Sequence, residues 1–328
     1  MRQKSSMIDT SVFQSLDDSL ILPDMADKEI DAVRALLLAN PRPDAISDRR
    51  KRLDALGTQF LIAPDVRIES AEVSGIAAEW SSTLDADPAC AILFLHGGGY
   101  VSGSLISHRP LATEMGRVAK ARTLALAYRL APEYPFPAAL EDALAGYRFL
   151  LSSGIDPRHI AVAGDSAGGG LTAALMVSAR DAGLPQPACG WCISPWVDLE
   201  CLGASMTSKA EVDPLIQRPY LKELAAAYLN GADPRSALAA PIYANLKQLA
   251  PLLIQVGSAE TLLDDAVRLA NVAGAADVAV TLEVWPDMIH VWPLFHHQLA
   301  AGRQALAQGG AFIRSRMSRH SGGSAFFE

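Results

Sequence analysis

The sequence has few cysteines and no long apolar run. Only four of its 328 residues are cysteine, namely Cys90, Cys189, Cys192 and Cys201. Four are too few for a disulfide framework in a chain of this length, and they indicate a reducing compartment. No stretch approaches the roughly 18 consecutive apolar residues of a membrane-spanning helix, and the polar, charged first residues lack the shape of a signal peptide. We therefore expect a cytoplasmic protein without a membrane span.

Positive charge is also in the minority. The chain has 28 lysines and arginines against 36 aspartates and glutamates, a formal net charge of −8. Such a chain has no basic field to attract a polyanion, so neither nucleic acid nor an anionic membrane is expected as its main partner. A small neutral substrate suits this charge balance better.

The spacing of Cys189 and Cys192 matches the C-x-x-C of redox motifs. Such motifs need an exposed thiol at a helix start, where the helix dipole lowers its pKa. Residues 187–194 instead have the apolar character of a short buried strand. The pattern favours packed thiols over a redox site.

Apolar runs of strand length alternate with longer helical patterns from residue 91 onward. The expected strands cover residues 91–95, 123–127, 160–163, 187–194, 252–256 and 280–284, and the expected helices cover residues 110–119, 138–152, 169–182, 262–273 and 296–315. This alternation predicts an α/β fold, with a mostly parallel sheet between two layers of helices. Ligand sites in such folds form at the carboxyl ends of the strands.

Two segments do not follow this alternation. Residues 1–60 and 200–230 are assigned to a helical cap, and residues 219–228 within the second segment form an amphipathic helical pattern. The catalytic core is then expected to comprise residues 61–199 and 231–317. The glycine- and serine-containing tail, residues 318–328, is predicted to be disordered.

The sequence Gly-Asp-Ser-Ala-Gly at residues 164–168 matches the G-x-S-x-G nucleophile motif. It follows an expected strand and precedes an expected helix, which is the context the motif requires. Ser166 would occupy a sharp turn whose neighbours, Gly164 and Gly168, must be small. On its own, the pentapeptide also fits an ordinary glycine-rich turn that happens to contain serine.

A second glycine-rich turn, His-Gly-Gly-Gly-Tyr at residues 96–100, also follows an expected strand. Consecutive glycines let backbone N–H groups approach the oxygen that becomes negative during acyl transfer. We predict an oxyanion hole formed by the amides of Gly98, Gly99 and Ala167. The spacing does not match the G-x-G-x-x-G of dinucleotide-binding turns. His96, at the head of the turn, is expected to order it by hydrogen bonding.

His290 is the predicted general base. It lies late in the chain, beyond the last expected strand, and the chain order of triads in this kind of fold is serine, acid, histidine. The acid should therefore lie between Ser166 and His290 on a loop after a strand. Glu260 is early in such a loop and is favoured, while Asp264 and Asp265 fall where the next helix has begun. A carboxylate in the second cap segment, Asp213, is a more distant alternative.

The remaining histidines are assigned no catalytic role. His108, His159 and His320 are interpreted as solvated surface residues. The pair His296 and His297 has no partner cluster at metal-ligand spacing, so it is interpreted as helix surface and no metal site is expected.

Taken together, the chain resembles the hormone-sensitive lipase family of α/β hydrolases, particularly its bacterial esterases. The resemblance rests on residues 96–100, 128–138, 164–169 and 256–265, and on His290 in its loop. It implies an eight-stranded, mostly parallel sheet with a helical cap, and no cofactor. Family members often pair through their last strand, so a homodimer is expected. Many members have aspartate at the position of Glu260, whose longer side chain must reach His290 from a displaced backbone.

These residues predict a serine carboxylesterase that hydrolyses short- to medium-chain esters of small molecules through an acyl-enzyme. The expected pocket-lining aromatic residues are Tyr100, Trp196, Tyr220 and Trp292, although all four also fit a role in packing. A lactone hydrolase with the same triad is an alternative. A non-catalytic ligand-binding receptor on the same fold is an alternative from a different class.

Overall fold

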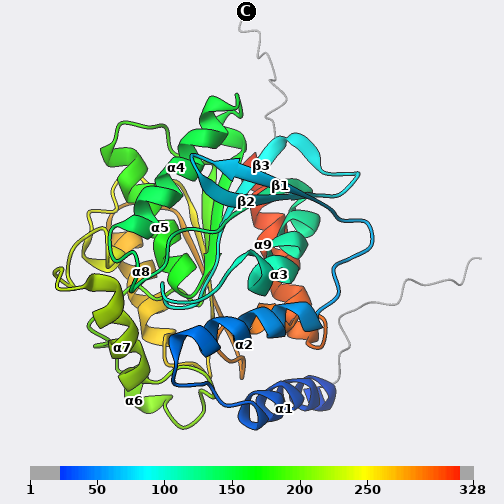
Figure 1. Ribbon diagram of the computed structural model, residues 1–328, viewed down its shortest axis with the longest axis vertical. Helices are drawn as coiled ribbons and strands as arrows, with labels where there is room; N and C mark the ends of the chain where they lie inside the picture. Colours follow the sequence, from blue (N-terminus) through cyan, green and yellow to red (C-terminus); the bar gives the residue numbers. More distant parts are fainter. Residues whose placement is uncertain (1–22, 318–328) are drawn as a thin grey trace, which may run out of the picture.

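The computed structural model describes residues 23–317 and contains one eight-stranded sheet (Figure 1). Its order is β1-β2-β4-β3-β5-β6-β7-β8. The strands are β1 (Arg67–Val73), β2 (Ile76–Ser82), β3 (Asp87–Leu95), β4 (Ala121–Leu126), β5 (Ile160–Asp165), β6 (Cys189–Ile193), β7 (Leu252–Gly257) and β8 (Val280–Trp285). The pairs β1/β2 and β2/β4 are antiparallel and the others are parallel. The predicted eight-stranded, mostly parallel sheet is confirmed, while the predicted disordered tail lies outside the described residues.

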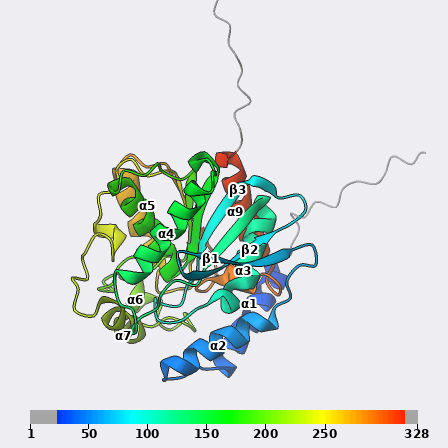
Figure 2. The same ribbon diagram turned by 45° about the horizontal axis from the view of Figure 1, so that its top comes forward.

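Helices cover both faces of the sheet (Figure 2). The helices are α1 (Pro23–Ala39), α2 (Ile46–Gln59), α3 (Leu105–Ala119), α4 (Ala138–Ser152), α5 (Ala167–Asp181), α6 (Ser205–Ser208), α7 (Arg218–Leu229), α8 (Leu263–Ala275) and α9 (Ala300–Met317), with short 3₁₀ turns at Pro157–His159, Pro241–Tyr243 and Trp292–Phe295. Helices α3 and α9 pack on one face, and α4, α5 and α8 pack on the other. This is the predicted layering.

The central strand β3 shows why its residues form a doubly covered strand. Leu93 and Leu95 belong to the core cluster shared with α4 and α5, whereas Ile92 and Phe94 belong to the cluster shared with α3 and α9. Side chains alternate between the faces of a strand, so a strand with helices on both sides must be apolar at every position. That is the continuous apolar run read from the sequence.

The antiparallel hairpin of β1 and β2 was not among the strands expected from apolar runs. Most of β1 is exposed, so its sequence carries little of the apolar signal that identifies buried strands. Ser74 and Gly75, with φ of 52° and 82°, form the turn between the strands, which is the backbone geometry of tight hairpins.

Two helices begin four or five residues away from the expected start. Helix α3 begins at Leu105, five residues before Pro110, because the Ser104 hydroxyl accepts hydrogen bonds from the amides of Ile106 and Ser107. Helix α9 begins at Ala300 rather than at His296, because a 3₁₀ turn at Trp292–Phe295 precedes it. Both shifts alter the surroundings of histidines.

Helices α1, α2, α6 and α7 lie together below the sheet in Figure 1. They come from the two segments predicted to form a cap, and α1, α2 and α7 line the same pocket as the loops after β3 and β5. Within residues 23–317, no helix is both long and apolar enough to cross a membrane. The cytoplasmic location stays a prediction.

Strand β6 contains both cysteines of the C-x-x-C spacing. Cys189 and Cys192 both lie buried in β6, and burial raises the pKa of each thiol to about 12. This supports packed thiols rather than a redox pair.

Strand β8 forms one edge of the sheet. Two copies of the chain could pair through this edge, and the homodimer stays a prediction.

Candidate active site

Ser166 occupies the sharp turn between β5 and α5. Its φ of 54° and ψ of −119° are strained for a residue with a side chain. The turn is fixed because the Ser166 amide donates to Ile193 O at 2.8 Å, while Ser166 O accepts from the Gly170 and Trp196 amides. A Cβ atom on Gly168 would collide with the carbonyl oxygen of Leu95, which explains the need for glycine there.

The structure brings His290 and Glu260 to Ser166. His290 Nε2 lies 2.9 Å from Ser166 Oγ, and His290 Nδ1 lies 2.6 Å from Glu260 Oε2. A carboxylate can only accept, so Nδ1 carries the proton and Nε2 is free to accept the hydroxyl proton of Ser166. The glutamate therefore reaches the imidazole despite its longer side chain.

Glu260 is held by two further hydrogen bonds. Its Oε1 accepts from the Gly257 amide at 2.7 Å and from Ser194 Oγ at 2.9 Å. Ser194 Oγ in turn accepts from the Val291 amide at 3.0 Å. Ser194 thus ties the acid to the histidine loop. The sequence analysis did not single out this residue, although its position directly after β6 follows the rule for strand ends.

The other candidate acids are engaged elsewhere. Asp264 accepts from the Ser205 amide. Asp265 accepts from the amides of the loop after β6, at residues 197 and 198. Asp213 accepts from the amide and hydroxyl of Thr261, so it supports the loop next to Glu260 without contacting His290.

The charges around His290 change its pKa. Burial acts to lower the pKa of His290, but the hydrogen bond and negative charge of Glu260 outweigh it, with further contributions from Asp213 and Asp165. The result is a pKa above the ordinary value of 6.5. The imidazolium that forms on proton transfer is therefore stabilised in place.

The backbone amides predicted to form an oxyanion hole lie beside Ser166. Gly98 and Gly99 line the same pocket as Ser166, with φ of 116° and 66° that favour glycine. Ala167 begins α5, where the amides of the first turn have no partner within the helix. Among the described residues, none of these three amides donates a recorded hydrogen bond.

His96 orders the glycine turn, in agreement with its expected role. Its Nδ1 donates to Gly97 O at 2.8 Å, and its ring stacks on Tyr128 at 4.2 Å between ring centroids. The Tyr128 hydroxyl donates to His96 O at 2.6 Å. Burial and the neighbouring His108 lower the pKa of His96 to about 3, so it stays neutral.

His108 is not a surface histidine, and this corrects the sequence interpretation. It is buried in the first turn of α3, and its Nε2 lies 3.3 Å from Asp165 Oδ2. The other oxygen of Asp165 accepts from the Gly97 amide at 3.0 Å. The error followed from the helix start expected at Pro110, which left His108 outside the helix. Asp165 occupies the variable position of the G-x-S-x-G motif, which by itself predicts no role for it.

The remaining histidines among residues 23–317 lie outside the site. His159 is half-buried in a short turn, and His320 is outside the described residues. His296 is buried before α9, contrary to the expected helix surface, whereas His297 is exposed. His297 stacks on Phe60.

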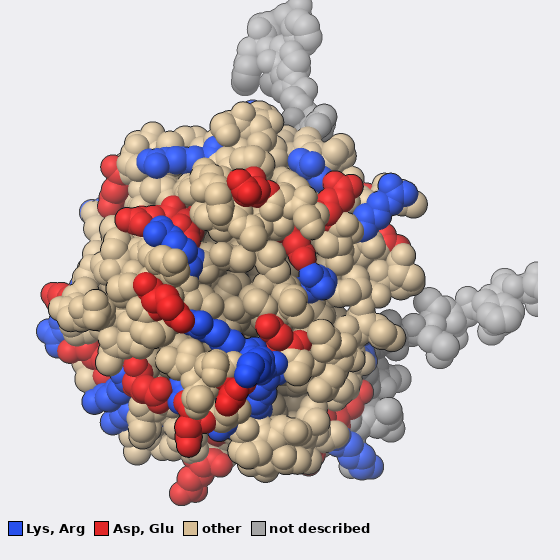
Figure 3. Space-filling model, viewed as in Figure 1, with Lys and Arg blue, Asp and Glu red and all other residues tan. Residues whose placement is uncertain are grey.

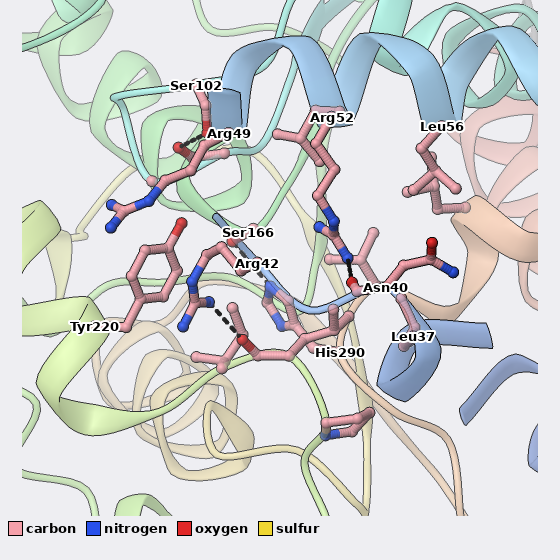
Figure 4. A pocket seen from close by; sticks show the side chains of 18 of the residues that line it. Leu37, Asn40, Arg42, Arg49, Arg52, Leu56, Ser102, Ser166, Tyr220 and His290 are labelled. Atoms are coloured by element: carbon pink, nitrogen blue, oxygen red, sulfur yellow. Dashed lines mark hydrogen bonds between the residues drawn. The ribbon is translucent and has the colours of Figure 1, made fainter. Parts of the chain in front are cut away.

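A pocket of about 280 Å³ opens onto Ser166 and His290 (Figure 4). Its wall is mostly apolar, and of the four predicted aromatic residues only Tyr220 lines it. Tyr100, Trp196 and Trp292 do not line the pocket, because they are buried in the core. Tyr100, for instance, stacks on Tyr228 at 3.8 Å between ring centroids. Their packing role, the alternative given above, is the one the structure supports.

Comparison with known proteins places these residues in a recognised context. A family described as alpha/beta hydrolase fold matches residues 92–294. A Streptomyces hygroscopicus protein named acetyl-hydrolase is 45% identical over 297 residues, which cover 89% of this chain and 98% of that protein.

Solved structures agree with this match. An esterase from the bacterial hormone-sensitive lipase family superposes with a TM-score of 0.87 at 44% identity, covering 89% of this chain and 99% of the other. The esterase EstE5, in a crystal soaked by p-nitrophenyl butyrate, gives 0.85 at 46% identity and covers 88% and 98%. These relatives favour an enzyme over a binding receptor.

Proposed function

This chain belongs to the bacterial hormone-sensitive lipase family of α/β hydrolases and is a carboxylic ester hydrolase, and we propose that it works through a covalent acyl-enzyme on Ser166. The observation that carries the proposal is the continuous chain of hydrogen bonds from Ser166 through His290 to Glu260. Each member is buried, and the low local dielectric strengthens these hydrogen bonds.

In the first half-reaction, Ser166 Oγ attacks the ester carbonyl carbon while its proton moves to His290 Nε2. The negative charge on the former carbonyl oxygen is stabilised by the amides of Gly98, Gly99 and Ala167. The tetrahedral intermediate then collapses, the bond to the alcohol oxygen breaks, and His290 gives its proton to the departing alcohol.

In the second half-reaction, water replaces the alcohol. It loses a proton to His290, attacks the acyl carbon, and forms a second tetrahedral intermediate that releases the carboxylic acid and returns the proton to Ser166. Glu260 keeps the imidazole in the tautomer that this cycle needs. Ser194 is a positioning residue, because it acts through Glu260 and the amide of Val291.

Short- to medium-chain esters suit the pocket. A volume of about 280 Å³ with a mostly apolar wall holds a small acyl group and excludes a long one without rearrangement. The relatives agree with this size, since one is named an acetyl-hydrolase and another was soaked with a butyrate ester.

The test is a panel of p-nitrophenyl esters of increasing acyl length, with simple lactones and anilides alongside. The wild-type protein should hydrolyse acetate and butyrate esters fastest, and Ser166→Ala should abolish this activity while retaining the wild-type circular dichroism spectrum. Turnover by folded Ser166→Ala equal to wild type would refute the proposal. Faster opening of lactones than of linear esters would favour the lactone alternative.

A further inference from the structure

Three arginines line the pocket in front of Ser166, and they differ in their partners. Arg49 is buried and forms a two-pronged ion pair with Glu223, with N–O distances of 2.7 and 3.3 Å. Its charge is neutralised. Arg42 and Arg52 form no ion pair with a carboxylate in the part of the chain that the structure describes.

The unneutralised pair is held by backbone carbonyls and by an aromatic ring. Arg42 donates to Leu215 O at 2.8 Å, and its Cζ lies 3.2 Å from the centre of the Tyr220 ring. Arg52 donates to Asn40 O at 2.5 Å. A guanidinium has five N–H donors, so each arginine keeps donors for another partner. In Figure 4 both side chains extend into the region where Ser166 and His290 lie.

This local charge is not balanced by the rest of the pocket. Asp165 is the one acidic residue that lines it within the described chain, and it is already bound to His108 and to the Gly97 amide. Burial acts most strongly to lower the pKa of Arg42, Tyr220 acts to raise it, and the charges of Arg49 and Arg52 lower it further. An anion entering the pocket would relieve that repulsion.

The outer surface does not share this excess. On the face seen in Figure 3, basic side chains over α2 are interleaved with acidic ones, and the chain as a whole carries a net charge of −8. A general attraction of anions to the surface is therefore absent. On this face the positive excess lies in the pocket, which points to recognition rather than to steering.

We propose that Arg42 and Arg52 bind a carboxylate of the substrate, so that the preferred substrates are esters bearing a free carboxylate, on either the acyl or the alcohol part. A planar carboxylate matches the paired N–H groups of a guanidinium, and the apolar wall accommodates the carbon chain between the carboxylate and the ester. This deepens the proposed function and rests on it. It replaces the neutral substrate expected from the net charge.

The test uses pairs of esters that differ only in charge. On the acyl side, mono-p-nitrophenyl glutarate is compared with its terminal carboxamide. On the alcohol side, p-acetoxybenzoate is compared with p-acetoxybenzamide. Each kcat/KM is divided by the second-order rate constant for hydroxide-catalysed hydrolysis of the same ester, which excludes attack by the ester's own carboxylate, and the carboxylate-to-carboxamide ratio is the readout.

In at least one pair the wild-type ratio should exceed unity by about tenfold, the effect of one hydrogen bond between charged groups. Arg52→Gln and Arg42→Gln should each lower the ratio toward unity, mainly through KM, and Arg52→Lys should restore part of it. Lys51→Gln removes the same charge from an exposed position on the same helix and should leave the ratio unchanged. Added salt should also lower the wild-type ratio.

A wild-type ratio near unity in both pairs would overturn the inference, as would a high ratio that survives in Arg52→Gln. Arg42→Gln also loses a contact between two segments, so Arg52→Gln and the salt series decide the question if that variant does not fold. Failure of the inference is distinguishable from failure of the proposed function, because the latter requires that even the neutral carboxamide esters are not hydrolysed.

Discussion

Two histidine–carboxylate pairs lie beside Ser166, and they are arranged differently. In one, His290 donates to Glu260 and directs its second nitrogen to Ser166 Oγ at 2.9 Å. In the other, the Nε2 of His108 faces Asp165 at 3.3 Å, and Asp165 also holds the Gly97 amide. Both pairs are buried.

The difference shows that geometry, rather than residue type, decides the role. His290 has a nitrogen free for the nucleophile, whereas the two nitrogens of His108 contact Asp165 and Ser107. The first pair can move a proton. The second is placed to hold the turn that carries Gly98 and Gly99, so we assign it a positioning role.

Replacing each histidine in turn should give the largest difference in kcat between the two pairs. His290→Gln removes the base, and we expect a loss of about 10⁴-fold in kcat with p-nitrophenyl butyrate. His108→Gln should lose only about tenfold, because the base remains and only the turn is loosened. Steady-state kinetics of both folded variants measure this, and equal losses would remove the distinction between the pairs.

Replacing the carboxylates, Glu260 and Asp165, should give a similar but smaller difference in kcat. Glu260→Gln removes the negative charge beside the imidazole and adds an NH2 group that can hold it in the wrong tautomer, so we expect a loss of about 10³-fold in kcat. Asp165→Asn keeps one acceptor for the Gly97 amide, and should lose between about 10- and 100-fold through a less well-placed oxyanion hole. The reverse ranking in steady-state kcat would assign the acid role to Asp165.

The pH dependence of kcat/KM should show a smaller difference between the two pairs. The base acts in its neutral form, and Glu260 raises the pKa of His290, so the neutral form appears only at higher pH. The profile of kcat/KM should therefore rise with a midpoint above 6.5. Glu260→Gln should move this midpoint down, and Asp165→Asn should move it down by less, because its charge contributes less to the shift. An unchanged midpoint in Glu260→Gln would contradict the proposed contact.

The smallest effect is expected from Asp264→Asn, the matched control for Glu260→Gln. Asp264 accepts one hydrogen bond from the Ser205 amide and does not contact His290. Its kcat should stay within about twofold of wild type, while the free energy of unfolding falls by about 1 kcal/mol. Activity assays and urea denaturation check both, and a loss as large as that of Glu260→Gln would reopen the choice of acid.

The contrast between the pairs also explains what the sequence could predict. Ser166, His290 and Glu260 follow strand ends in a fixed chain order, so their meeting was predictable from motif context. His108 lies on no motif, and its burial depends on a helix that begins at Leu105 because Ser104 caps it. A five-residue shift of that helix start was enough to hide the second pair.

The pocket wall was less predictable than the catalytic residues. Aromatic residues near strand ends fit either a pocket or the core, and only tertiary packing distinguishes the two. Three of the four predicted aromatic residues are buried in the core. Arg42 and Arg52, which do line the pocket, belong to the N-terminal segment, where the sequence has no motif. The β1–β2 hairpin was missed for a related reason, since its exposed residues give little apolar pattern.

Covalent labelling tests the central claim most directly. A fluorophosphonate probe reacts with a serine hydroxyl only when a neighbouring base activates it, and peptide mass spectrometry locates the adduct. We predict a single adduct on Ser166 in the wild-type protein and a strongly slowed reaction at Ser166 in His290→Gln. Labelling at another residue, or equally fast labelling of Ser166 without His290, would contradict the account.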